Sequence, residues 1–147
     1  MKPKFWKLSQ GDKNFKDIIE SINDGLVYVH KNTRSKGISV QSQADDFVNA
    51  SIGDYFYLTH GNNGIYCIGQ FSGPANIFSK YREGWMVRKF DFIFASLTNR
   101  KYSGVQKWWA PNDNSTFTCV PSNEMTLFEK EILKPFFGIS LEQFGLS

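Results

Sequence analysis

The stretch YFYLTHGNNGIYCIGQF, residues 55–71, decides the fold expected from this sequence. Two runs rich in aromatic and β-branched residues, 55–60 and 65–71, flank the tetrapeptide GNNG. Such runs favour strands, and Asn and Gly tolerate the backbone conformations that a tight turn needs. The stretch therefore predicts an antiparallel β-hairpin.

Further strands are predicted on both sides of this hairpin. The run WMVRKFDFIFASL alternates between two sets of side chains, which is typical of one long, curved strand. Apolar residues recur at helical spacing in one segment near the start of the chain. The expected strands are 5–9, 26–30, 85–97 and 116–120, and the expected helix is 13–23.

Two capping boxes predict further helices. Ser42 and Asp45 fit the start of a short helix, and Thr126 and Glu129 fit the start of a second one that Pro135 ends. With the strands, these elements predict an α+β fold: a small, curled, mostly antiparallel β-barrel with two to three flanking helices. The length of 147 residues predicts a single domain over 1–147.

Composition limits the function only loosely. The apolar content of 41% is enough for one core, and the net charge of +3 permits a polyanion partner without requiring one. Cys67 and Cys119 lack metal-ligand spacing, so we expect reduced thiols in an intracellular, cytoplasmic protein with no metal and no cofactor. No apolar run approaches about 18 residues, so no membrane span is expected.

Catalytic motifs are not found. The sequence has no P-loop, GxSxG, HExxH or GxGxxG pattern. His30 and His60 lie on predicted strands without carboxylates at metal spacing, so a structural role is favoured for both. His30 alternates with Tyr28, which adds some weight to a place in a pocket. These observations predict a protein that is not an enzyme.

The stretch KWWAPNDNSTFTCV, residues 107–120, combines two tryptophans with a polar run. Adjacent side chains of a strand point to opposite faces, so at most one of Trp108 and Trp109 enters one core. Aromatic rings stack on nucleobases, while Asn, Gln and Ser can read the base edge. The stretch predicts recognition of a nucleobase; the alternative is one core indole and one that packs under the loop.

Basic residues gather in two segments and could follow a nucleic-acid backbone. An ordinary charged surface explains them equally well. The candidate phosphate contacts are Lys31, Arg34, Lys36, Lys80, Arg82, Arg88 and Lys107, with Lys89 beside them.

The order of these features resembles the EVE/YTH branch of the PUA-like domains, small β-barrels that bind modified bases. FWKLSQGD resembles the first strand of an EVE domain, which carries a Trp and then a Ser at its exit. GLVYVH resembles the strand that carries one cage wall in YTH domains. The hairpin at 55–71, with Gly-Asp before it, and GWMVRKFDFI resemble the strands that follow.

The resemblance implies a base-binding pocket. Ser9, Gln10 and Asn14 would make polar contacts, and Tyr28 would replace the cage Trp of the family. Phe78 and Tyr81 would supply a second wall, and His30, on the same strand face as Tyr28, is a further candidate for the pocket. The loop containing Asn112, Asp113 and Asn114 would close over the pocket, with one indole of Trp108 and Trp109 at its border.

The resemblance further implies the DNA-recognition module of an McrB-type subunit of a modification-dependent restriction system. Its ligand would be DNA with a methylated base, flipped into the pocket, and a GTPase motor would lie outside this chain. One alternative is a stand-alone reader of a modified RNA base. Another is a small hydrolase of the ASCH type, which would need a Lys, Glu or Tyr of perturbed pKa at the pocket base. A protein-interaction module would instead show an exposed apolar patch and no basic face.

Overall fold

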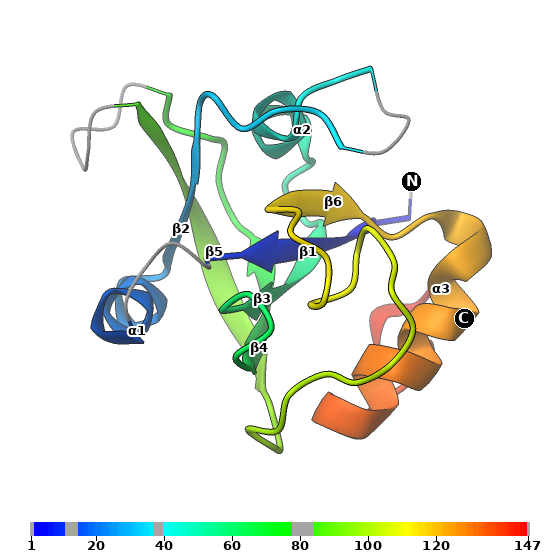
Figure 1. Cartoon of the computed structure of the whole chain (residues 1–147). Helices are drawn as coiled ribbons and strands as arrows, with labels where there is room; N and C mark the ends of the chain where they lie inside the picture. Colours follow the sequence, from blue (N-terminus) through cyan, green and yellow to red (C-terminus); the bar gives the residue numbers. More distant parts are fainter. Residues whose placement is uncertain (1, 11–14, 37–39, 78–83, 147) are drawn as a thin grey trace.

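A six-stranded, curled sheet forms the centre of the molecule (Figure 1). The computed structural model describes residues 2–10, 15–36, 40–77 and 84–146. Its strands are β1 (Phe5–Ser9), β2 (Leu26–His30), β3 (Tyr55–Thr59), β4 (Ile65–Phe71), β5 (Trp85–Ala95) and β6 (Phe117–Cys119). They follow the order β2-β5-β4-β3-β1-β6, in which β1 and β3 are parallel and the other neighbours antiparallel. The predicted α+β class with a curled, mostly antiparallel sheet is confirmed.

The hairpin that decided the expected fold is present. β3 and β4 pair antiparallel from Tyr55 opposite Gln70 to Thr59 opposite Ile65, and the GNNG segment joins them. The Thr59 hydroxyl is hydrogen-bonded to the carbonyl of Gly64, 2.8 Å away, which fastens the turn to the strand end. The turn therefore lies at the same end of the sheet as the exit of β1, since β1 and β3 run parallel.

Helices cover both sides of the sheet. α1 (Phe15–Asp24) and α2 (Gln43–Asn49) follow β1 and β2 in the chain. After β6, the chain forms η1 (Ser122–Glu124), α3 (Met125–Phe128), η2 (Glu129–Phe137) and η3 (Leu141–Phe144). In Figure 1 these C-terminal helices lie away from α1, on the other side of the sheet.

Two hydrophobic clusters form because adjacent residues of a strand point to opposite faces. On β1, Phe5 belongs to the cluster under the C-terminal helices, and Trp6 belongs to the cluster with α1 and α2. β3 alternates in the same way, with Tyr57 in the first cluster and Phe56 in the second. The sheet is thus buried on both faces around β1 and β3.

The capping box predicted for α2 agrees in part with the structure. The Ser42 hydroxyl accepts a hydrogen bond from the Asp45 backbone N–H at 3.0 Å, which satisfies one of the free donors of the first turn. α1 occupies most of the predicted 13–23 range, and its predicted first two residues lie outside the described residues.

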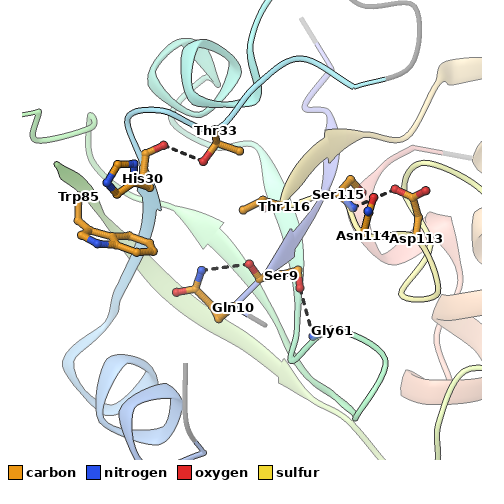
Figure 2. Close-up of a pocket in the computed structure, with 10 residues that line it drawn as sticks. All are labelled: Ser9, Gln10, His30, Thr33, Gly61, Trp85, Asp113, Asn114, Ser115 and Thr116. Atoms are coloured by element: carbon orange, nitrogen blue, oxygen red, sulfur yellow. Dashed lines mark hydrogen bonds between the residues drawn. The ribbon is translucent and has the colours of Figure 1, made fainter. Parts of the chain in front are cut away.

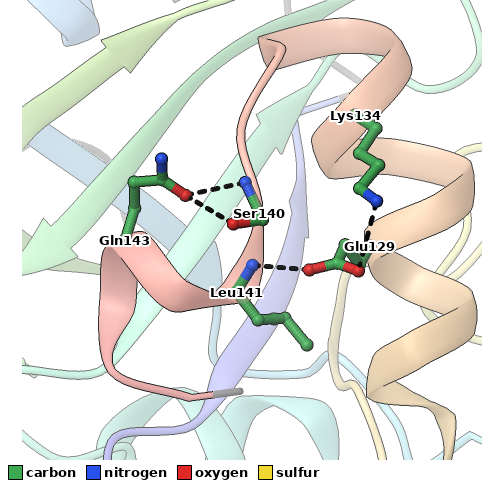
Figure 3. A network of polar contacts seen from close by, with 5 residues as sticks. All are labelled: Glu129, Lys134, Ser140, Leu141 and Gln143. Carbon is green, nitrogen blue, oxygen red and sulfur yellow. Dashed lines mark hydrogen bonds and ion pairs between the residues drawn. The ribbon is translucent and has the colours of Figure 1, made fainter.

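The prediction for the last helix is wrong at both ends. Helical structure begins at Ser122 and runs through Pro135 to Phe137, and the left-handed Gly138, with φ of 67°, ends it. Pro135 lacks an N–H, and the helix passes it in the wider π form. The Glu129 carboxylate accepts from the Leu141 backbone N–H at 2.7 Å, so it anchors η3 and does not cap the start of the helix (Figure 3).

The two cysteines are free thiols, Cys67 buried and Cys119 partly buried. Burial raises the pKa of the Cys67 thiol to about 12 and that of the Cys119 thiol to about 11. Both are therefore protonated at neutral pH. Among the helices in the described part of the chain, none has the length and apolar character needed to cross a membrane.

Candidate functional site

A cavity of about 640 Å³ opens where β1 ends, and we call it the first cavity (Figure 2). It collects residues from the β1 exit, the end of β2, the hairpin turn, the start of β5 and the loop before β6. The described residues that line it are Ser9, Gln10, His30, Thr33, Gly61, Trp85, Asp113, Asn114, Ser115 and Thr116. Figure 2 shows His30 and Trp85 on one side of the cavity and Asp113–Thr116 on the other.

The β1 exit is fixed by the two strands beside it. The Ser9 backbone N–H donates to the Thr116 carbonyl at 2.8 Å, and the Ser9 hydroxyl accepts from the Gly61 N–H at 3.1 Å. The Gln10 side-chain amide donates to the Tyr28 carbonyl at 2.8 Å, which joins β1 to β2 across the cavity floor. Its Oε1 acceptor is buried and has no hydrogen-bond partner in the described part of the chain.

An aromatic wall stands where β2 and β5 pair. His30 is opposite Trp85 in the antiparallel register, so both side chains lie on one face. Their rings are 5.2 Å apart and nearly perpendicular, and the Tyr28 ring meets Trp85 edge-on at 5.7 Å. Trp85 therefore lines the first cavity, where the sequence analysis had expected the ring of Tyr28.

Tyr28 itself lies beside the first cavity and is not among the residues that line it. Its side chain is only 2% exposed. It lines a smaller cavity of about 130 Å³ between β2 and α1, together with acidic residues of the helix such as Asp17 and Glu20. Tyr28 thus supports Trp85 from behind, since the two rings are in contact.

Gln43 on α2 holds the loops on the two sides of the first cavity. Its side-chain carbonyl accepts from the backbone N–H groups of Thr116 and Phe117 at 2.7 and 2.8 Å. Its amide group donates to the Arg34 carbonyl at 2.9 Å. A buried side chain with three hydrogen bonds to backbone fixes the distance between the 31–36 segment and the loop before β6.

Lys7 is the most unusual group next to the cavity. It is fully buried, and its ammonium donates to the Asp113 carbonyl and to the Ser115 hydroxyl, both at 2.8 Å. Desolvation lowers the pKa of Lys7 from 10.5 to about 7, against the opposing effect of Asp113. The Ser115 N–H donates to the Asp113 carboxylate at 2.9 Å. Two cavity-lining residues therefore depend on one buried amine.

Of the two adjacent tryptophans, Trp109 is buried in the core and Trp108 lies at the surface. Trp109 is 1% exposed, packs on Phe128 in the core, and donates its ring N–H to the Glu124 carboxylate at 2.9 Å. Trp108 is 52% exposed. It lines a second cavity of about 510 Å³, which adjoins the first because Asp113 lines both.

The predicted phosphate contacts fall in different surroundings. Lys31 and Arg34 are exposed and each directly follows a lining residue of the first cavity, His30 or Thr33, in the sequence, and Lys36 binds the Asn114 side-chain oxygen. Lys107 forms an ion pair with Glu124 at 2.6 Å, and together with the Trp109 indole it lowers the pKa of that carboxyl.

The prediction for Arg88 is corrected. Its side chain is 1% exposed, and its guanidinium donates to the carbonyls of Phe47, Ala50 and Gly73 at 2.7–2.9 Å. It ties α2 to the sheet and has no exposed face for a phosphate. Burial lowers its pKa.

Several predicted residues lie outside the described residues: Asn14, Phe78, Lys80, Tyr81 and Arg82. Asn112 is partly buried and donates to the Gly104 carbonyl at 3.3 Å, so it supports the loop that Asp113 and Asn114 bring to the cavity. His60 lies near Tyr66 on the hairpin, away from the first cavity.

Sequence reasoning missed Trp85, Thr33 and Gly61 as lining residues, whereas Ser115 and Thr116 belong to the polar stretch that it had singled out for base recognition. A signal for Trp85 existed, because pairing the 26–30 and 85–97 strands antiparallel would have set an aromatic ring opposite His30. Within the described chain, no group of three His, Cys, Asp or Glu side chains is placed to hold a metal ion.

The chain matches no protein-family model, and no curated protein is similar to it in sequence. Among solved structures it is similar to the crystal structure of the MmI1 YTH domain, with 12% sequence identity and a TM-score of 0.44. The match covers 63% of this chain and 65% of that chain, which is less than two thirds of its length. At this TM-score the likeness carries no functional conclusion, so the function has to be inferred from the residues of the site.

Proposed function

We propose that this domain binds nucleic acid and holds a modified base, flipped out of its strand, in the first cavity. The observation that carries the proposal is the joining of an aromatic wall, His30 and Trp85, with a polar loop, Asp113–Thr116, across one cavity. Its volume of about 640 Å³ is in the range of small-ligand sites.

A nucleobase is the ligand that uses both sides of such a cavity. Its flat face stacks on an aromatic ring, with a gain of about 1–3 kcal/mol per base. Its edge needs hydrogen-bonding groups, which the Ser9 hydroxyl and the loop side chains supply. The exposed Lys31 and Arg34 directly follow the lining residues His30 and Thr33 in the sequence, and their charges suit the phosphates that flank a base.

The resemblance of the sequence to EVE/YTH domains supports a finer proposal. The ligand would be DNA with a methylated base, and the domain would target a modification-dependent restriction subunit that carries a GTPase motor. A modified base in RNA remains the alternative ligand, because the same cavity groups serve both sugars. We propose that the domain binds without changing its ligand chemically.

The test is a titration of the whole chain against matched modified and unmodified oligonucleotides, as DNA and RNA, single-stranded and duplex. We expect tighter binding to one modified set. Trp85→Ala should remove about 1–3 kcal/mol of that binding, because it removes the stacking surface. Trp85→Phe, which keeps a ring, should restore part of it.

Asn114→Ala tests the polar side and has a matched control. Asn114 lines the first cavity, whereas Asn62 is exposed on the hairpin turn. Loss of one edge hydrogen bond should cost about 0.5–1.5 kcal/mol in Asn114→Ala and nothing in Asn62→Ala. If Trp85→Ala and Asn114→Ala both bind every oligonucleotide as the unchanged protein does, the cavity is not the binding site.

Lys7 favours one second candidate, the small hydrolase. A lysine with a pKa of about 7 beside a cavity can act as a base or nucleophile. Against this role, both of its hydrogen bonds go to Asp113 and Ser115, and its side chain is fully buried. Incubation with modified nucleosides and mass analysis decides the matter, since a product that Lys7→Met abolishes would establish an enzyme.

A further inference from the structure

The exposed Trp108 indole has no role in the core. Its neighbour Trp109 fills that position, and the Trp108 carbonyl accepts hydrogen bonds from the hydroxyls of Ser115 and Thr118 at 2.5 and 2.7 Å. The backbone at Trp108 is therefore anchored while its ring remains 52% exposed. A large ring held outward on a fixed backbone is a surface that costs little to order when something binds to it.

Lys36 connects this indole to the first cavity. Its ammonium lies 5.4 Å from the centre of the Trp108 ring and also hydrogen-bonds the side chain of Asn114, a lining residue of the first cavity. The cavity beside Trp108 shares Asp113 with the first cavity. The Lys36 ammonium therefore lies between the Trp108 ring and the first cavity.

We propose that Trp108 stacks the base of the nucleotide next to the one held in the first cavity, and that Lys36 meets the phosphate joining the two. This inference rests on the proposed function and deepens it, because it makes the ligand an unpaired stretch of at least two nucleotides. When the nucleotides bind, the Lys36 ammonium leaves the Trp108 ring and contacts the phosphate, and the base stacks on the ring face that the ammonium has left.

The flat Trp108 ring and the charge of Lys36 both suit a second nucleotide. Stacking on an indole is tolerant of base identity, so this second position adds affinity and little sequence preference. The linking phosphate carries one negative charge, which matches the single ammonium of Lys36. Lys107, which also lines the second cavity, is already paired with Glu124 at 2.6 Å and is not needed for the contact.

The experiment compares ligand lengths on the whole chain. The probes are the modified mononucleotide that the chain selects and the dinucleotide and trinucleotide that contain it. The unchanged protein should bind the dinucleotide more tightly than the mononucleotide. Trp108→Ala should weaken dinucleotide binding by about 5- to 150-fold, the equivalent of one stacked base, and leave mononucleotide affinity unchanged. Trp108→Phe should retain part of the gain.

Phe92→Ala is the control, since Phe92 is 50% exposed but lies on β5 and lines neither cavity. It should bind all probes as the unchanged protein does. Equal weakening of mononucleotide and dinucleotide by Trp108→Ala would overturn the inference, and so would no weakening at all. If Trp85→Ala still weakens binding in that case, the first cavity remains the proposed base-binding site, and only the inference about stacking on Trp108 is rejected. No binding of any probe would overturn both.

Discussion

Lys7 shows how one residue can couple the sheet to the site. Its ammonium crosses from β1 to the loop before β6 and holds both Asp113 and Ser115. Replacing a buried charge by an apolar group of similar length often stabilises a fold, because the desolvation cost disappears. Here the same replacement would release two residues that line the first cavity.

The lowered pKa of Lys7 predicts a pH dependence of stability. The pKa is about 7 in the folded protein and 10.5 as the reference for the unfolded chain, so between these values the unfolded chain binds more protons. The free energy of unfolding should therefore rise with pH through this window, by at most about 1.4 kcal/mol per pH unit. Denaturant titrations of the unchanged protein and Lys7→Met from pH 6 to about 8 measure it.

The difference between the two proteins isolates Lys7 from other groups. Cys67 and Cys119 have raised pKa values in the folded state, so above pH 8 their ionisation in the unfolded chain opposes folding and obscures the effect. The stability of Lys7→Met should change less with pH than that of the unchanged protein. Parallel curves for the two proteins would mean that Lys7 does not titrate in this window.

Sequence analysis could predict those site residues that neighbouring residues in the sequence point to. It missed those whose place depends on contacts between strands far apart in the chain. Ser9 and Gln10 followed from the family resemblance, and the loop 112–114 from its composition. Lys7 gave no signal, because a lysine in a strand normally indicates an exposed face. Its burial follows from β6 and its loop, which lie more than a hundred residues further along the chain.

At the scale of elements, β4 carries a glycine that the sheet needs. A Cβ at Gly69 would lie 2.6 Å from ring atoms of both Phe56 and Phe90, whose rings pack edge to face at 5.2 Å. The pairing of β4 with β5 shifts by one residue at this position. The missing side chain therefore lets two aromatic rings close over the strand where it bends.

We predict that Gly69→Ala destabilises the fold by about 1–3 kcal/mol, because the methyl group forces two packed rings apart. Urea unfolding of the purified protein measures the change. Gly73→Ala is the matched control, since its added Cβ would meet only the Cβ of Lys89 at an ordinary 3.7 Å. If the two variants lose the same stability, the rings around Gly69 adjust freely and the packing argument fails.

Predicted elements agreed with the structure where the signal was local. The hairpin turn, the alternation of β5 and the N-cap of α2 depend on neighbours in sequence. The C-terminal helices did not follow their local signals: Pro135 lies inside η2, and Glu129 contacts η3. Phe128, Ile132 and Leu133 pack against the sheet, and this tertiary contact outweighs the helix-ending tendency of one proline.

At the scale of the whole molecule, the net charge of +3 is small, so the position of the charges matters more than their sum. Lys31 and Arg34 are exposed in the segment that carries the lining residues His30 and Thr33, whereas Lys130 is exposed on η2, on the other side of the sheet (Figure 1). Lys31 and Arg34, unlike Lys130, are therefore expected to contact the phosphates of a strand bound at the cavity.

Affinity for nucleic acid should therefore fall as the salt concentration rises, and it should fall less steeply when one of these basic residues is replaced. Lys31→Ala and Arg34→Ala should each reduce the slope of log affinity against log salt by about 0.7 for a single strand. Lys130→Ala should leave it unchanged. Binding titrations at four salt concentrations test this, and affinity independent of salt would contradict binding through phosphates.

The sheet order has a consequence for how the molecule is made. β1 pairs with β3 from Phe5 opposite Tyr55, and with β6 from Trp6 opposite Cys119. A ribosome releases β1 before either neighbour exists, so one edge of this strand stays unpaired until β3 is made, and the other stays unpaired until β6 is made much later. Such distant pairings slow folding. The first cavity is complete only after β6 is in place, and a nascent chain that stops short of it would have no ligand site to fill.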